Sequence, residues 1–306
     1  MPEGDAVWRT ARTLDDALSG RQLLDADLRW PTIATARLAG MMVSQTVPRG
    51  KHLLTRLDSG WTLHSHLRMD GSWVIEPTGG TAQRSPSRSK GPPRAASRVP
   101  EQRSGRRPES RGGGFVRAVL VGPDYTAIGV DLGMLDLVRT TEEHTLVGHL
   151  GPDLLDPRFD TELAIRNLVA AEGTIGAALL DQTNLAGLGT IWASETLFAE
   201  RIQPWTPSSG LDRTTIEGLV NRARKLLQAS LAGPLPSSTG SQLPGRNTWV
   251  HGRSGRQCVR CGGTIRVASI GPATRERPMF YCPVCQGGLG PTDDGRPAAP
   301  LGTRRQ

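Results

Sequence analysis

The sequence predicts an α+β protein with more than one domain, and three observations lead to that class. One helical segment at the N-terminus is followed by strand-like segments up to about residue 140. From about Asp160 the apolar period becomes helical, and four cysteines stand in two close pairs near the C-terminus. At 306 residues the chain is long enough for two domains with their own cores and a small third module.

The N-terminal part, residues 1–140, is predicted to be one β-rich domain behind a single helix. Residues 5–18 form that helix, because Asp5 can cap it, apolar residues recur on one face, and Gly20 can end it. Strand-like segments follow from about Gln22 to Glu76. The stretch "GKHLLTRLDSGWTLHSHLRM" predicts a hairpin with "LDSG" as its turn.

Residues 77–114 interrupt this domain. The segment has almost no large apolar residues and is rich in Pro, Gly, Ser and Arg, so we expect a disordered insertion. It holds nine Arg and Lys against two Glu, and therefore accounts for +7 of the net charge of +8. Two interpretations of it stay open: added, salt-dependent affinity for DNA, or a neutral low-complexity insertion. Strand patterning resumes at "FVRAVLVG" and "YTAIGVDLGMLDLV".

Residues 141–240 are predicted to be helical. One helix begins at the cap Asp160 and stops at Gly173, and a long one runs from Asp212 to Leu231. Between them, "TIGAALLDQT" and "TIWASETLFAERI" predict two helices joined by "NLAGLG". A tight glycine turn leaves free N–H groups at the start of a helix, where the helix dipole favours a phosphate, although the same turn can simply end a helix.

The third predicted module, residues 245–286, contains all four cysteines, and residues 287–306 are expected to form a disordered tail. The pattern Cys-x2-Cys, twenty residues, Cys-x2-Cys is typical of a tetrahedral zinc site made by Cys258, Cys261, Cys282 and Cys285. A closed set of four thiolates predicts one structural Zn2+ ion. The alternative, two disulfides, needs an oxidising compartment. Seven Arg and a single acid between Gly245 and Tyr281 favour a polyanion as partner.

Three further stretches carry candidate functional residues. Removal of Met1 from "MPEGD" exposes Pro2 as an amine nucleophile, whereas the bland alternative is an ordinary helix start. Lys51 in "PRGKHLL" follows a turn glycine and is either a phosphate contact or a solvated hairpin lysine. Met69 in "SHLRMDGSW" stands in a turn, where an exposed apolar side chain can fill the gap left by an unstacked base; the commoner alternative is core packing.

Taken together, these stretches resemble the formamidopyrimidine-DNA glycosylase and endonuclease VIII family. The similarity covers nearly the whole chain, and the order and the distances agree as well as the motifs: "MPEGD", "GKHLL", "LLDQTNLAGLGTIWASETLF" and "HGRSGRQCVRCG…RPMFYCPVCQ". The wording of "PEGD" and "HLRMDGSW" is closer to the endonuclease VIII branch, actinobacterial type. The resemblance implies a β-sandwich N-terminal domain, a helix-two-turn-helix domain and a C-terminal zinc-finger β-hairpin.

The resemblance also implies a function. Such an enzyme is a bifunctional DNA glycosylase and abasic-site lyase of base excision repair, which removes an oxidised base and cleaves the strand by β,δ-elimination. Pro2 would form a Schiff base with C1′, Glu3 would be the general acid/base, and Lys51 would contact the phosphate beside the lesion. Arg277 would grip the flanking phosphates with Arg253 in support. Asn184, Gly189, Thr190 and Met69 complete the implied DNA contacts.

Some departures from the family bear on the substrate. Thr190 stands where relatives usually carry Asn, and "VDLGMLD" lacks the Arg and Phe pair of the purine-specific branch. That leaves Met69 as the wedge, with Leu132 and Leu135 as candidate helpers, and favours oxidised pyrimidines. The alternatives are a non-catalytic zinc-finger DNA-binding protein on the same scaffold, or an oxidised-purine glycosylase.

The expected partner is damaged double-stranded DNA, with single-stranded or bubble DNA left open. No secretory signal or membrane span stands out, so we expect a monomer in the cytoplasm, associated with the nucleoid. The histidines, including His64 and His66, show no metal or triad spacing and are interpreted as structural.

Overall fold

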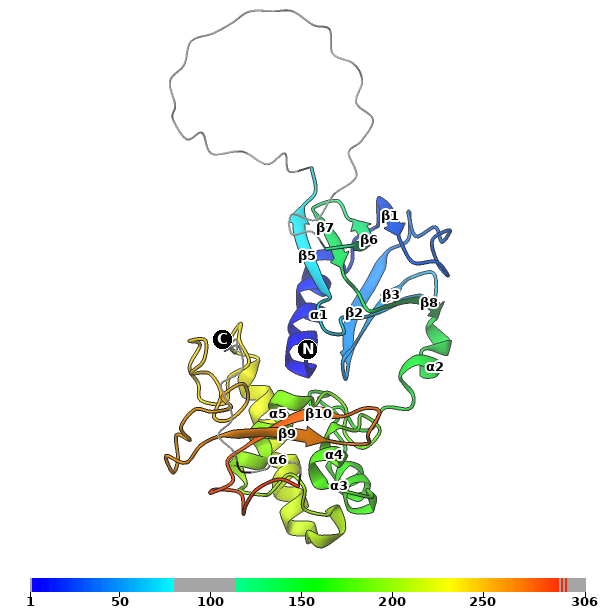
Figure 1. Cartoon of the computed structure of the whole chain (residues 1–306). Coiled ribbons are helices and arrows are strands. Elements are labelled where there is room, and N and C mark those ends of the chain that lie inside the picture. Colours follow the sequence, from blue (N-terminus) through cyan, green and yellow to red (C-terminus); the bar gives the residue numbers. More distant parts are fainter. Residues whose placement is uncertain (1, 80–113, 292, 294, 296–306) are drawn as a thin grey trace, which may run out of the picture.

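The computed structural model describes residues 2–79, 114–291, 293 and 295, and its N-terminal part is a β-sandwich (Figure 1). Two four-stranded antiparallel sheets form it, in the orders β2-β3-β4-β8 and β1-β6-β7-β5. The first sheet contains β2 (Val43–Arg49), β3 (His52–Leu57), β4 (Trp61–His66) and β8 (Met134–Arg139). The second contains β1 (Asp25–Leu28), β5 (Ser72–Pro77), β6 (Val116–Val121) and β7 (Tyr125–Val130). The β-sandwich fold and the hairpin of β3 and β4 are as expected. Most of the predicted insertion, residues 80–113, lies outside the described residues.

Helix α1 (Gly4–Leu18) buries the face that its sequence predicts. Val7, Ala11, Leu14 and Leu18 are buried in the core of the sandwich. The helix ends at Leu18 with Ser19 as its C-cap, and Gly20 has φ +73°, a conformation that glycine adopts without strain. Figure 1 shows that the start of α1 lies where the β-rich part meets the helical part.

The predicted cap of α1 is wrong. Glu3 is at the N-cap position, and Asp5 lies inside the first turn with its side chain buried. The Asp5 carboxylate accepts hydrogen bonds from Trp192 Nε1 (3.2 Å) and Ser230 Oγ (2.7 Å), and it pairs with Arg9 (3.3 Å). Asp5 therefore ties α1 to two helices of the other domain.

The helical half matches the predicted pattern. Short 3-10 turns at Thr140–Glu142 and Ser208–Gly210 accompany α2 (His144–Val147), α3 (Thr161–Ala170), α4 (Ile175–Leu180), α5 (Thr190–Ala199) and α6 (Arg213–Ser230). The side chains of Asp160 and Asp212 cap α3 and α6 by accepting from backbone N–H groups three residues later (2.9 and 2.7 Å). Gly173 has φ +82° after α3. The core is built around Trp192, which is fully buried. No helix among the described residues is long and apolar enough to cross a bilayer.

The C-terminal module is a two-stranded antiparallel hairpin of β9 (Arg266–Ile270) and β10 (Arg277–Tyr281). Residues 287–306 were expected to form a disordered tail, but Asp293 within them is held against the hairpin. Asp293 accepts hydrogen bonds from Arg266 Nη1 and from the Tyr281 hydroxyl, both at 2.6 Å. A buried charge requires a partner of opposite charge, and Arg266 is largely buried. Its bond to Asp293 therefore holds the start of residues 287–306 against the hairpin.

Candidate active site and metal centre

Glu3 occupies the anion site that the sequence offers at the start of α5. One carboxylate oxygen accepts from the backbone N–H of Gly189 (2.8 Å) and of Trp192 (3.3 Å), and the other accepts from Ile191 (2.7 Å). These are the unpaired N–H groups of a helix N-terminus, and a carboxylate satisfies them as a phosphate would. In this structure the amide of Gly189, a predicted DNA contact, donates to Glu3.

Glycine is required at position 189 for space. A Cβ atom there would lie 2.5 Å from Glu3 Cδ, which is far inside van der Waals contact. The backbone N–H of Gly4 also donates to the carbonyl of Gly187 (2.9 Å). The helix-two-turn-helix loop therefore fixes the segment that follows Pro2.

Burial controls the charge of Glu3. The side chain is 2% exposed, and this burial raises the pKa of Glu3 to about 7, against the opposing effects of Lys51 and the Ile191 amide; the negative charge of Asp5 raises it further. A carboxyl group with a pKa near neutrality can both give and take a proton at physiological pH.

Lys51 stands in the two-residue turn between β2 and β3 and is only 7% exposed. Gly50 precedes it with φ +58°, and the Gly50 N–H donates to the Asp153 carboxylate (2.6 Å). Burial lowers the pKa of Lys51; the negative charge of Glu3 opposes this shift, and Arg277 adds to it. Asp153, from the segment that enters the helical domain, thereby fixes the turn that carries Lys51.

One hollow brings together four of the residues selected from the sequence. It is lined by Lys51 of the sandwich, by Gly189 and Thr190 at the start of α5, and by Arg277 at the start of β10. His66 and Arg68 line the same hollow. The result is a cationic depression at the junction of the three modules, with buried Glu3 hydrogen-bonded to the α5 residues beside it.

Other predicted contact residues have different environments. Asn184 donates its side-chain N–H to the carbonyl of Ala178 (3.1 Å) and so braces the end of α4. Arg253 donates to the carbonyl of Gln257 (3.0 Å) within its own module. Met69 is 60% exposed, as a wedge requires. The candidate helpers Leu132 and Leu135 are instead buried in the core, which corrects that expectation.

Two side chains that sequence reasoning missed organise the site, half-buried Gln182 and buried Glu195. Gln182 accepts from the N–H of Gly187 and donates to the carbonyl of Leu188, so it shapes the turn before α5. Glu195 is fully buried and accepts backbone N–H groups from residues 249–251, which anchors the C-terminal module to α5. Burial raises the pKa of Glu195. The only sequence signal for Glu195 was a charged residue on the otherwise apolar helix "TIWASETLF".

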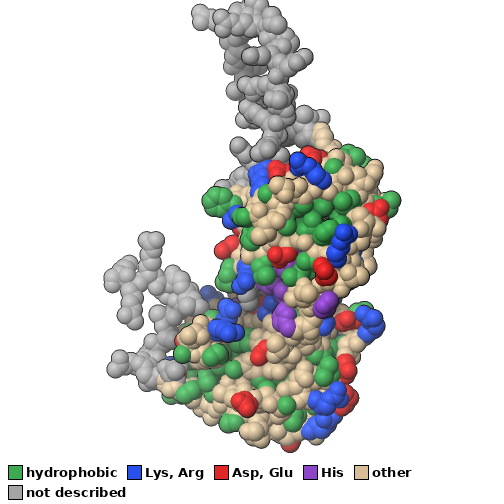
Figure 2. Space-filling model, turned by 90° about the vertical axis from the view of Figure 1, so that its right-hand side faces the viewer, with side chains coloured by type: hydrophobic (Ala, Val, Ile, Leu, Met, Phe, Trp, Pro, Cys, Tyr) green, Lys and Arg blue, Asp and Glu red, His purple; other side chains and the backbone are tan. Residues whose placement is uncertain are grey.

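Four of the six histidines form a cluster that their spacing did not reveal. His64 is buried between Asp136 (2.9 Å) and His52 (2.8 Å), and the ring of His52 contacts those of His66 and His149. Burial and the neighbouring cations lower the pKa of His66 to about 4. Figure 2 shows histidines and Lys or Arg side chains together where the β-rich part meets the helical part.

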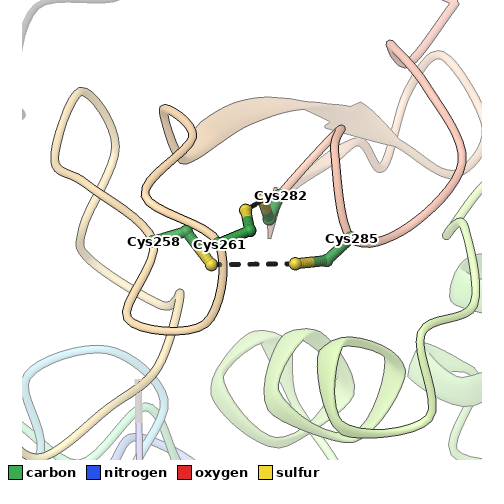
Figure 3. Close-up of side chains that lie close together, drawn as sticks. All are labelled: Cys258, Cys261, Cys282 and Cys285. Carbon is green, nitrogen blue, oxygen red and sulfur yellow. Dashed lines mark hydrogen bonds between the residues drawn. The ribbon is translucent and has the colours of Figure 1, made fainter.

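The four cysteines converge as their spacing predicts (Figure 3). All four sulfurs lie within 4.8 Å of one another; Cys258 and Cys285 Sγ are 3.9 Å apart, and Cys261 and Cys282 Sγ are 3.5 Å apart. These separations are too long for a disulfide and close to the ~3.8 Å edge of a tetrahedron with Zn–S bonds of about 2.3 Å. The cluster fits a four-thiolate metal site.

Comparison with known proteins agrees with this arrangement. Residues 1–103 match the formamidopyrimidine-DNA glycosylase N-terminal domain, and residues 150–239 match the formamidopyrimidine-DNA glycosylase H2TH domain. "Probable endonuclease 8 2" of Streptomyces coelicolor is 44% identical over 297 residues, covering 97% of this chain and 98% of the relative. "DNA-(apurinic or apyrimidinic site) lyase Nei2" of Mycolicibacterium smegmatis is 36% identical, covering 94% and 99%.

Solved structures share the fold. A complex of Lactococcus lactis Fpg with abasic-site-containing DNA superimposes with a TM-score of 0.72 at 23% identity, covering 93% of this chain and 99% of that one. The fold, the cysteine cluster and the two near-full-length relatives agree, and the chain belongs to the formamidopyrimidine-DNA glycosylase and endonuclease VIII family.

Proposed function

We propose that this endonuclease VIII-like DNA glycosylase and abasic-site lyase removes oxidised pyrimidines from damaged DNA through a Schiff base at Pro2. The observation that carries the proposal is Glu3, a buried carboxyl group whose pKa is raised to about 7. It directly follows Pro2 and lies at the junction lined by Lys51 and Arg277. A binding protein has no need for a proton donor at that position.

The proposed chemistry begins at the sugar. Once Met1 is removed, the lone pair of the Pro2 nitrogen attacks C1′, and the bond from C1′ to the damaged base breaks with its electron pair leaving on the base. The proton that the Pro2 nitrogen then loses neutralises the departing base. Glu3 gives its proton to the ring oxygen O4′, which opens the sugar and leaves an iminium ion between C1′ and Pro2. An α-amine with a pKa of about 7.7–8.0 is unprotonated far more often at neutral pH than a lysine at about 10.4.

Strand cleavage follows from the same iminium ion. Loss of a C2′ proton expels the 3′ phosphate, and loss of a C4′ proton then expels the 5′ phosphate, which is β,δ-elimination. Glu3, again ionised, is the proposed base for the first of these steps. The cations Lys51 and Arg277 hold the phosphates on both sides of the lesion, so they position the sugar at Pro2.

A pyrimidine preference is supported by the turn between β7 and β8. Asp131 has φ +49°, the Gly133 N–H donates to the carbonyl of His66 (2.9 Å), and Leu132 is buried. This turn is tight and presents no Arg and Phe pair toward DNA, which is the feature expected of a purine-acting enzyme on this scaffold.

We further propose that the cysteine cluster holds one structural zinc ion. Cys258, Cys261, Cys282 and Cys285 would supply four thiolates and leave no coordination position for substrate. The ion would stabilise the hairpin that presents Arg277.

Borohydride trapping tests the proposal. The protein, with removal of Met1 confirmed by mass, is mixed with an oligonucleotide carrying one abasic site, beside Pro2→Gly and Glu3→Gln variants. A covalent adduct mapped to Pro2 is expected, followed by faster release of oxidised pyrimidines than of 8-oxoguanine. Tight binding without an adduct refutes the lyase assignment, and an adduct through a lysine refutes Pro2 as nucleophile.

A further inference from the structure

Two large apolar side chains near the active site are exposed to solvent. Met69 is 60% exposed and Phe115 is 72% exposed, and both line one hollow with Arg68 and Asp70. Single exposed apolar side chains are common, whereas large ones exposed next to one another mark a contact surface. The turn after β7 contributes no such side chain, because Leu132 is buried.

The sheet register places Phe115 at the same end of the sandwich as Met69. In the second sheet Val130 pairs with both Val116 and Ser72. Phe115, which precedes β6, and the turn before β5 therefore lie at the same end of the strands. Two backbone hydrogen bonds fix Phe115: its N–H donates to the Asp131 carboxylate, and its carbonyl accepts from the Asp131 N–H, both at 2.8 Å.

The ring of Phe115 also contacts the side chain of Arg117. The guanidinium of Arg117 lies 5.6 Å from the centre of the Phe115 ring and 5.5 Å from that of Trp30, within the range of cation–π contact. A ring anchored in this way loses little conformational freedom when it packs against a partner.

The hollow beside Phe115 adjoins the cationic hollow of the active site. Arg68 lines both, and its φ of +56° is a conformation that a non-glycine residue rarely adopts. Apolar side chains therefore lie on one side of Arg68, and the phosphate-binding candidates Lys51 and Arg277 on the other.

We propose that Phe115 acts with Met69 as the wedge that supports duplex DNA after the damaged nucleotide leaves the stack. This inference rests on the proposed function. Met69 fills the gap, and the Phe115 ring packs against the face of an adjoining base, a contact open to every base because each has a π-face. Met69, in the turn before β5, and Phe115, just before β6, thus supply the exposed apolar side chains that the short turn after β7 lacks.

The test compares one abasic oligonucleotide as a single strand and as a duplex, because only the duplex has a gap to fill. Single-turnover cleavage rates are measured for the wild type, Phe115→Ala, Met69→Ala and the control Tyr125→Ala. Tyr125 is a 39% exposed aromatic residue that pairs with Pro77 at the far end of the same sheet. Phe115→Ala is expected to lower the ratio of duplex to single-strand rates about tenfold, about 1.4 kcal/mol, while Tyr125→Ala leaves it unchanged.

The outcomes separate the two proposals. An unchanged ratio in Phe115→Ala, an equal loss on both substrates, or the same fall in Tyr125→Ala overturns the wedge assignment and leaves the enzyme intact. A wild-type protein that cleaves neither substrate overturns the proposed function, and the wedge with it.

Discussion

Replacing Glu3 by glutamine tests the carboxyl group as a proton donor, because the two side chains have nearly the same shape. The reaction needs protonated Glu3, whose pKa is about 7, together with an unprotonated amine at Pro2. With an amine pKa of about 7.7–8.0, the rate should peak near pH ~7.4, where each group is in the required form in about three molecules in ten and both together in about one in ten.

The acid and alkaline limbs of this pH–rate profile are set by different groups. Below the peak the rate falls as the amine takes up a proton, and above it the rate falls as Glu3 loses one. Glutamine carries no such proton, so Glu3→Gln should keep the acid limb, lose the alkaline limb and level off near pH ~9, where the amine is almost fully unprotonated. Near the wild-type peak its rate should be lower by roughly 100-fold or more.

The assay is single-turnover release of an oxidised pyrimidine from a duplex, measured from pH 5.5 to 9.5 at constant ionic strength. DNA affinity is measured in parallel at each pH, so that loss of binding is separated from loss of chemistry. An alkaline limb that persists unchanged in Glu3→Gln would refute the reasoning, because another group would then be the acid.

Three further changes probe the support of the site. Gly189→Ala places a methyl group 2.5 Å from the Glu3 carboxyl carbon, and single-turnover rates should fall about 100-fold. The control Gly210→Ala, whose added methyl group meets no atom within 4 Å, should not change them. Asp5→Ala leaves two buried donors, on α5 and α6, without their acceptor. The free energy of unfolding, measured in urea, should therefore fall by about 2–4 kcal/mol. A change below about 0.5 kcal/mol, as expected for a surface substitution, contradicts this role. Cys282→Ser should abolish stoichiometric zinc, measured by elemental analysis, and expose the hairpin to proteolysis, while retention of one zinc per chain contradicts a four-thiolate site.

Local sequence patterns were sufficient to predict most of the helices and the cysteine cluster. Asp160 caps its helix as predicted, and Asp212 caps the helix that was predicted to begin there, because a cap depends on residues only three positions apart. The cysteine pairs converge because a short hairpin between two Cys-x2-Cys turns leaves the sulfurs little choice of position. Met69 is exposed for an equally local reason, since it stands in a turn next to Asp70 and Gly71.

Long-range contacts decided what the pattern around Asp5 and Gly189 could not. Asp5 resembles a helix cap in sequence, but its partners lie on α5 and α6, nearly two hundred or more residues away. The free amides at Gly189 predict an anion, and only the tertiary structure shows that the anion is Glu3. The sequence offered almost no indication of the role of Glu195, because its partners are three backbone N–H groups of a distant segment.

The sequence by itself determined the family, the order of the modules and the residue types available for chemistry, because these reside in short motifs and their spacing. The tertiary structure alone decided the protonation of the site. Burial is a property of the assembled domains, and it is burial that raises the pKa of Glu3 toward neutrality and lowers that of Lys51. It also decided that Phe115, an unremarkable residue at the start of a strand, lies beside Met69, because strand register is a relation between segments far apart in the chain.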